Sequence, residues 1–153
     1  MHSTRWLEAA ALALTVLLAG CAGEPARNTA SGDAAYEAST IAAAMVGKPY
    51  RYGGNSPRGF DCSGLVYYSY RQAGLRVPRS TETQRAHSHK VSLARLARGD
   101  LLFFDQQGKF SSHVGIYLGS NRFVHAPSSG KRVRVDSLNE SYWQRHLVDA
   151  RRF

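Results

Sequence analysis

Three side chains that could together carry nucleophilic chemistry stand far apart in this chain: Cys62, His113 and His125. Cys62 follows an acidic residue in "GFDCSGLV", at the start of a stretch whose pattern predicts a helix. The free N–H groups and the dipole at a helix N-terminus favour a thiolate over a thiol. A thiol nucleophile also needs a base, and the base needs a group that orients it. The sequence therefore predicts cysteine-based catalysis if the fold brings these three side chains together.

The two histidines are distinguished by their surroundings. His113 and His125 each lie in an apolar stretch with strand-like composition, where a single histidine would most simply be a buried ring with a satisfied hydrogen bond. If residues 119–121 form a three-residue turn, Gly115 faces His125, and His113 is the diagonal neighbour of His125 on the same face. A turn of two or four residues would put the two rings on opposite faces of the sheet.

The elements that must position these side chains follow from the sequence pattern. Asp61 can cap one helix, and Thr81 and Gln84 have the spacing of a capping box at another. Helices are predicted at 36–47, 61–74, 80–87 and 139–146. Strands are predicted at 100–105, 113–119, 122–126, 131–136 and 148–153. In the strand at 131–136, Val133 and Val135 are expected to point inward. Helices followed by antiparallel strands indicate an α+β domain.

The N-terminus has the features of a secretory signal, with a basic start, a short apolar stretch and small residues in "MHSTRWLEAAALALTVLLAGC". The apolar stretch is too short to span a bilayer comfortably. Its last four residues, "LAGC", resemble the bacterial lipobox, in which a signal peptidase cuts before the cysteine. We therefore expect a signal peptide at 1–20 and a lipidated Cys21 followed by a flexible tether over 21–35. Ala22 suggests, by resemblance to Gram-negative lipoproteins, the periplasmic face of the outer membrane.

Export also constrains the thiol and the charge. The chain has two cysteines, so lipidation of Cys21 leaves Cys62 without a disulfide partner. An unpaired thiol in an oxidising compartment is a liability unless it is buried or used. A small buried cysteine is the simplest alternative, but it fits poorly with a helix start that follows a glycine-rich loop. The net charge of +9 predicts an anionic partner. In an exported protein we expect cell-wall carboxylates or lipid headgroups rather than nucleic acid.

Four motifs occur in order along the chain: "GFDCSGLV", "RGDLLFF", "SSHVGIYLG" and "FVHAPSSG". Together they resemble the NlpC family of papain-like cell-wall peptidases, from about Tyr50 to the C-terminus. Within that family the chain is most similar to short Spr-type murein endopeptidases, which are outer-membrane lipoproteins. The resemblance implies a papain-like α+β fold with N-terminal helices packed on a central antiparallel sheet. It also implies a catalytic domain at 36–153, no cofactor or metal, and a monomer that acts on peptidoglycan.

By this resemblance Cys62 is the nucleophile, His113 is the general base and acid, and His125 orients His113. The expected reaction is hydrolysis of peptidoglycan stem peptides or cross-links, at a bond involving D-glutamate or diaminopimelate. Two alternatives are a non-catalytic peptidoglycan-binding lipoprotein and a cell-wall amidase on the same scaffold. A metal site formed by the same three side chains lacks a Cys-x-x-Cys pair and an obvious fourth ligand.

Further site residues flank the nucleophile. Tyr50 matches a tyrosine that family members place near the developing oxyanion, although Tyr52 lies two residues away. Asp61 and Ser63 stand on either side of Cys62. We expect these residues to contribute to an oxyanion hole or to substrate binding, with backbone N–H groups at the helix start as the donors.

Replacing Cys21 with Ser tests the predicted lipid anchor. A hydroxyl cannot take the place of the thiol that is acylated, so we expect the Cys21→Ser protein to be soluble or unprocessed, whereas the wild type sediments with membranes. Membrane fractionation followed by immunoblotting measures this difference. Unchanged anchoring of Cys21→Ser would refute lipidation.

Overall fold

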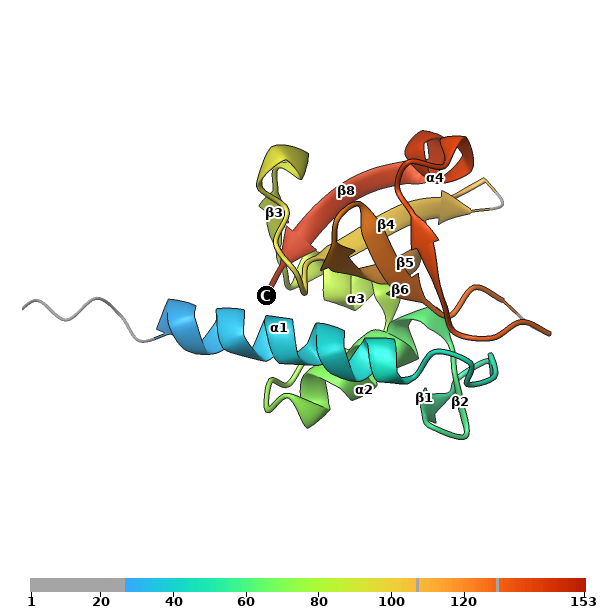
Figure 1. Ribbon diagram of the computed structural model, residues 1–153, viewed down its shortest axis with the longest axis horizontal. Coiled ribbons are helices and arrows are strands. Elements are labelled where there is room, and N and C mark those ends of the chain that lie inside the picture. The colour runs from blue at the N-terminus through green and yellow to red at the C-terminus, as the bar shows by residue number, and fades with distance from the viewer. Residues whose placement is uncertain (1–26, 107, 129) are drawn as a thin grey trace, which may run out of the picture.

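The computed structural model describes residues 27–106, 108–128 and 130–153, which form helices and a six-stranded sheet (Figure 1). The helices are α1 (Arg27–Ala44), α2 (Cys62–Gln72), α3 (Thr81–Ala86) and α4 (Ser141–His146), with a 3-10 turn η1 (Leu93–Arg95). A small hairpin pairs β1 (Asn55–Ser56) with β2 (Gly59–Phe60). The main sheet contains β3 (His89–Val91), β4 (Leu101–Gln106), β5 (Lys109–Gly119), β6 (Arg122–His125), β7 (Arg134–Ser137) and β8 (Leu147–Arg152). Its order is β3-β8-β4-β5-β6-β7 and every pairing is antiparallel, which confirms the predicted α+β class.

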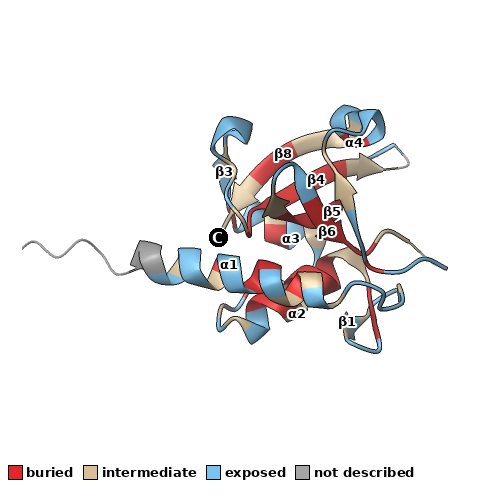
Figure 2. Ribbon diagram, in the orientation of Figure 1, coloured by how far each residue is buried: buried red, intermediate tan, exposed pale blue. Residues whose placement is uncertain are grey.

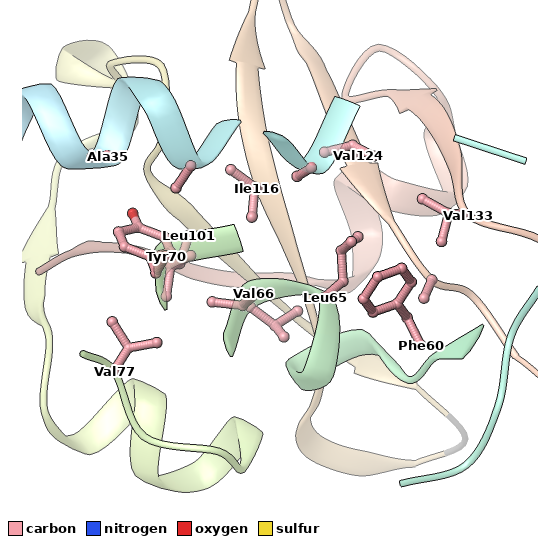
Figure 3. Packing of buried hydrophobic residues seen from close by; sticks show 14 of the residues in the cluster. Ala35, Phe60, Leu65, Val66, Tyr70, Val77, Leu101, Ile116, Val124 and Val133 are labelled. Atoms are coloured by element: carbon pink, nitrogen blue, oxygen red, sulfur yellow. The ribbon is translucent and has the colours of Figure 1, made fainter. Parts of the chain in front are cut away.

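The sheet buries a separate apolar cluster on each face. On the face covered by α1 and α2, Ile116 of β5 belongs to a cluster with Leu65 of α2 (Figure 3). On the opposite face, Trp143 of α4 packs against Phe104 and Phe123. Successive strand residues point to opposite faces, so β5 contributes to both clusters. Figure 2 shows the buried residues gathered where α2 and the strands meet.

Helix α1 begins earlier than the sequence predicts. The flexible tether was expected over 21–35, but residues 27–35 belong to α1, and residues 1–26, with Cys21, lie outside the described part. Contacts with distant segments explain the difference. Ser31 Oγ donates a hydrogen bond to the Phe153 carbonyl at 2.7 Å, and Ala35 is buried against Gly99. Tertiary packing of this kind supplies most of the stability of a helix within a protein.

The predicted helix boundaries hold closely for α2 and shift by one residue for α3. Asp61 is the N-cap of α2, as expected from its side chain. In α3 the N-cap is Ser80 rather than Thr81, because the Ser80 hydroxyl accepts the hydrogen bond from the Thr83 N–H. Gln84 is therefore not part of a capping box, and its side chain is buried. Within the described residues, no helix is both long enough and apolar enough to cross a bilayer.

Each of the five predicted strands is present, but β5 begins four residues early, at Lys109, and the sequence predicts neither β3 nor the β1–β2 hairpin. Val133 is buried as expected, but it precedes β7. Val135 was expected to point inward and is 38% exposed. It pairs with the buried Val124 of β6, but β7 is the last strand in the sheet order and has only one neighbour. The correction therefore follows from the place of β7 in the sheet, which alternation alone does not reveal.

Substitution of Gly99 by Ala tests the packing of α1 on the domain. Gly99 has φ +98°, and a Cβ atom there would collide with the backbone of Ala35. We expect Gly99→Ala to lower the free energy of unfolding by about 3 kcal/mol or more, from left-handed backbone strain together with overpacking. Gly74→Ala is the matched control, because Gly74 has φ +85° and open space around it, and it should cost about 1–2 kcal/mol. Urea unfolding measures both, and equal costs would contradict this packing.

Candidate active site

Cys62 is the first residue of α2, where the sequence places the start of the helix. The carboxylate of Asp61 accepts hydrogen bonds from two backbone N–H groups, that of Gly64 at 2.6 Å and that of Gly53 at 2.9 Å. The Gly54 carbonyl occupies the space that a Cβ atom on Gly64 would need. The glycine-rich loop and the first turn of α2 are thus packed backbone to backbone, which fixes the position of Cys62.

The side chains that flank the nucleophile are engaged with α3 and the segment before it. Arg79 Nη2 pairs with Asp61 Oδ2 at 2.7 Å, and Arg79 Nη1 donates to Ser63 Oγ at 2.9 Å. The buried Gln84 donates from Nε2 to the Ser63 carbonyl at 3.0 Å. Asp61 and Ser63 therefore brace the start of α2, and their expected roles toward substrate stay predictions. Sequence reasoning gave Gln84 a capping role and missed this contact.

The Cys62 thiol is surrounded by hydrogen-bonding groups from α3 and β5. Its sulfur lies 3.7 Å from Thr81 Oγ1 and also meets the backbone N–H of Val114, the residue that follows His113. Burial raises the pKa of Cys62, and the hydrogen bonds from Thr81, Val114 and Ser63 offset this only in part. These surroundings favour the thiol at rest. They act against the helix N-terminus, which is expected to favour a thiolate.

His113 and His125 meet directly across β5 and β6. His113 Nε2 lies 2.8 Å from His125 Nδ1, and both side chains are buried. The ring planes are nearly perpendicular, at 82°. The predicted proximity of the two imidazoles is confirmed.

A β-bulge brings the two rings to the same face. The turn itself has two residues, Ser120 and Asn121, both with positive φ, and this length alone would separate the rings. Gly119 pairs with Arg122 beside the turn, but the register then shifts, and Leu118 is the extra residue in β5. Beyond the bulge, Ile116 pairs with Val124, which is the register that places Gly115 opposite His125. The expected register is therefore confirmed, although it arises from a shorter turn plus a bulge.

Asp136 extends the pair into a His–His–Asp row that the sequence analysis missed. Its Oδ2 accepts a hydrogen bond from His125 Nε2 at 2.9 Å. The same oxygen accepts from Arg134 at 2.7 Å and from the Trp143 indole N–H at 3.2 Å. The available signal was an aspartate at the end of the alternating stretch after the His125 strand. The alternating pattern does not reveal its importance, because that pattern predicts Val133 and Val135 as the inward residues.

The electrostatic surroundings keep both imidazoles neutral. Burial lowers the pKa of His113, His125 lowers it further, and the carboxylate of Asp136 raises it in part. Burial also lowers the pKa of His125, and Arg134 and Lys131 act in the same direction, whereas the hydrogen bond that His125 donates to Asp136 raises it. A neutral imidazole with one free lone pair can act as a base.

The remaining ring nitrogen of His113 is the one available to the thiol. His113 Nε2 is engaged with His125, which leaves Nδ1 as the ring nitrogen that could accept a proton, and the next residue, Val114, contacts the sulfur through its backbone N–H. No hydrogen bond joins Cys62 to His113 in the described ranges. Such contacts are often long without substrate and tighten when it binds. Among the described residues, no group of three or more His, Cys, Asp or Glu side chains is arranged to hold a metal ion.

Tyr50, rather than Tyr52, lies beside the nucleophile. Burial raises the pKa of Tyr50, and the nearby Cys62 and Asp61 raise it further, whereas the Tyr52 side chain is 89% exposed. The Tyr50 backbone is tied down by a hydrogen bond from its N–H to the Lys131 carbonyl at 2.9 Å. The position is consistent with the expected site role, which stays a prediction.

Comparison with known proteins identifies the family. Residues 47–152 match the NlpC/P60 family. The chain belongs to the NlpC/P60 family. It is 48% identical over 114 residues to the murein DD-endopeptidase MepH of Escherichia coli, covering 71% of this chain and 42% of MepH. It is 46% identical over 107 residues to the E. coli murein DD-endopeptidase MepS/murein LD-carboxypeptidase, covering 69% of this chain and 56% of that protein. The chain thus spans about half the length of these curated relatives.

Solved NlpC/P60 structures share the fold. A lipoprotein-like NLP/P60 family protein of Staphylococcus aureus superposes with a TM-score of 0.69 at 37% identity, covering 78% of this chain and 41% of that one. The NlpC/p60 domain of the peptidoglycan hydrolase SagA superposes with a TM-score of 0.67 at 33% identity, covering 78% of this chain and 98% of the domain. The family and the α+β fold expected from the four motifs are confirmed.

Protonation of the buried histidines should couple to folding. Because the pKa of His113 is lowered in the folded state, the unfolded chain binds more protons below about pH 6.5. Between pH 7 and pH 5 we expect the free energy of unfolding to fall by about 2 kcal/mol more in the wild type than in His113→Gln. Urea unfolding at both pH values measures this. His89→Gln, which removes an exposed histidine, is the matched control variant. A wild-type pH dependence in His113→Gln would contradict the buried neutral state of His113.

Proposed function

We propose that the chain is a cysteine endopeptidase that hydrolyses peptide bonds of peptidoglycan. The observation that carries the proposal is the placement of Cys62, at the capped start of α2 and against the β5 main chain beside His113, with His125 behind that ring. Membership of the NlpC/P60 family and the similarity to proteins named murein endopeptidases support the substrate class.

In the mechanism, His113 Nδ1 takes the proton of Cys62 as the sulfur attacks the substrate carbonyl. The charge that develops on the carbonyl oxygen is stabilised by N–H donors at the helix start, among them that of Ser63, and by Tyr50. The imidazolium of His113 then protonates the leaving amine, which leaves a thioester on Cys62. His113 next removes a proton from water, and the resulting attack releases the acyl group and restores the thiol.

The proposed bond is the D-alanyl–diaminopimelate cross-link between stem peptides. The two relatives with 48% and 46% identity are named DD-endopeptidases. The Bacillus subtilis relative CwlT, named a bifunctional muramidase/DL-endopeptidase, is 42% identical. The second candidate is therefore the bond between D-glutamate and diaminopimelate. Both substrates carry carboxylates, which suit a chain of net charge +9.

We also propose that a lipid on Cys21 holds the enzyme at the periplasmic face of the outer membrane, where it acts as a monomer. The support is the lipobox-like "LAGC" and the signal-like residues before it. Acyl chains on one cysteine add about 0.8 kcal/mol of membrane affinity per buried methylene, so several chains anchor a protein stably.

Digestion of purified sacculi by the wild type and by Cys62→Ala tests the activity. The wild type should convert cross-linked muropeptides into monomers with new free amines on diaminopimelate, as identified by mass spectrometry. Cys62→Ala should lower the rate by about 10³-fold or more, because no other group can form the thioester. Sedimentation with sacculi checks that this variant still folds and binds.

The other outcomes distinguish the alternatives. Binding of the wild type without release of any product would favour a non-catalytic wall-binding protein, and release of whole stem peptides would favour an amidase. Equal hydrolysis by the wild type and Cys62→Ala would remove the nucleophile assignment. We expect His113→Ala to lose turnover as Cys62→Ala does, and His125→Ala to lose less, because His125 acts through His113.

A further inference from the structure

One carboxylate stands at the end of the His–His–Asp row, away from the thiol. Asp136 Oδ2 accepts from His125 Nε2 at 2.9 Å, and His125 Nδ1 lies 2.8 Å from His113 Nε2. The side chain of Asp136 is 10% exposed, so this contact is largely shielded from water. The three side chains come from β5, β6 and β7, which are consecutive strands of the sheet.

The chemistry of a carboxylate gives each bond in this row a direction. Burial by itself would raise the pKa of Asp136. Hydrogen bonds from His125 and Arg134 outweigh this effect and lower the pKa to about 2. An ionised carboxylate has no proton to donate, so it can only accept, and His125 must present Nε2–H to it. A neutral His125 then has its lone pair on Nδ1. Since that lone pair can only accept, the proton between the two rings belongs to His113 Nε2.

The same reasoning fixes the free nitrogen of His113. A neutral imidazole carries one proton, and here that proton is on Nε2, so Nδ1 holds a lone pair. We propose that Asp136 is a positioning residue that sets the tautomers of His125 and His113, so that Nδ1 of His113 is ready to accept the proton of Cys62. This inference rests on the proposed function, and it adds a residue to the machinery that the sequence motifs did not contain.

Proton transfer through this arrangement balances without a further reactant. The S–H bond of Cys62 breaks and an N–H bond forms at His113 Nδ1, giving a thiolate and an imidazolium. His113 keeps its Nε2–H and continues to donate to His125, which stays neutral. The negative charge of Asp136 stabilises the new positive charge, as it does in the resting protein by raising the pKa of His113. Asp136 itself neither gains nor loses a proton.

The groups around Asp136 are arranged to keep it ionised and fixed. Arg134 of β7 contacts Oδ2 through Nε at 3.0 Å and Nη2 at 2.7 Å, and the Trp143 indole N–H of α4 contacts it at 3.2 Å. The charged groups facing His125 are Asp136, Arg134 and Lys131. The Trp143 ring also packs on both imidazoles, with centroids 6.0 Å from His113 and 4.9 Å from His125.

Nitrogen NMR of the histidine rings tests the proposal independently of activity. In ¹⁵N-histidine-labelled protein, His113 and His125 should both show Nε2 protonated and Nδ1 unprotonated at pH 7. In Asp136→Asn the amide can donate as well as accept, so we expect His125, and with it His113, to populate the Nδ1–H form. Asp136→Glu, which keeps a carboxylate, should restore the wild-type pattern at least in part.

A control carboxylate separates this role from general stability. Asp100 is also buried and is held by an arginine, with Arg152 Nε at 2.6 Å and Nη2 at 2.8 Å, and among the described residues none of its hydrogen bonds involves a histidine. Asp100→Asn should leave both tautomers unchanged. In the sacculus assay we expect Asp136→Asn to lower kcat by about ten- to a hundredfold with little change in KM, because the base is mispositioned rather than removed.

Several results would overturn the inference. A wild-type spectrum with His113 protonated at Nδ1 would overturn it, even if Asp136→Asn did not fold. Unchanged tautomers in a folded Asp136→Asn would also overturn it, and so would the same tautomer change in Asp100→Asn. The predicted spectra combined with an inactive wild type would refute the peptidase function and leave the tautomer assignment standing.

Discussion

The register between β5 and β6 is the constraint on which the site depends. His113 and His125 can meet only if they point to the same face of the sheet, and a shift of one residue in pairing would separate them. The two-residue turn at Ser120 and Asn121 would produce that separation, and the bulge at Leu118 reverses it. Bulges of this kind recur beside active sites, where they re-aim side chains without breaking the sheet. The contact between the His113 and His125 rings depends on this one extra residue in β5, whereas the contact of His125 with Asp136 follows from the register between β6 and β7.

The site combines chemistry that requires charge with surroundings that oppose it. The imidazoles lie among Phe104, Phe123 and Trp143, and burial keeps them neutral at rest. Burial likewise keeps Cys62 as a thiol. In the proposed mechanism, charge therefore appears on Cys62 and His113 together, by transfer of one proton between them. The carboxylate of Asp136 carries the permanent charge in the His–His–Asp row. It is ion-paired with Arg134 on the partly exposed edge strand β7, where the cost of desolvating a charge is lower.

The start of α2, and with it Cys62, is held by contacts with several neighbouring segments. The glycine-rich loop packs on the first turn of α2, Arg79 ties Asp61 to Ser63, and Gln84 binds the Ser63 carbonyl. Helix α1, although it is rich in alanine and carries no strong apolar stripe, is fixed by contacts with the segment around Gly99 and the C-terminal residue. These contacts join segments that are distant in the sequence, so local composition could suggest a helix at 36–47 but not that residues 27–35 are helical too.

The sequence alone determined the family, the α+β class and the capped start of α2 at Asp61, and it predicted Cys62, His113 and His125 as site residues, because these depend on local patterns and on motifs in order. Tertiary structure alone decided the partner of His125, the resting state of the thiol and the exposure of Val135. Asp136 reaches His125 because β7 pairs with β6, and Trp143 of α4 also contacts it. The pKa of Cys62 depends on the groups that surround its sulfur. Register, burial and the place of a strand at the sheet edge are properties of packed neighbours, which a one-dimensional pattern does not contain.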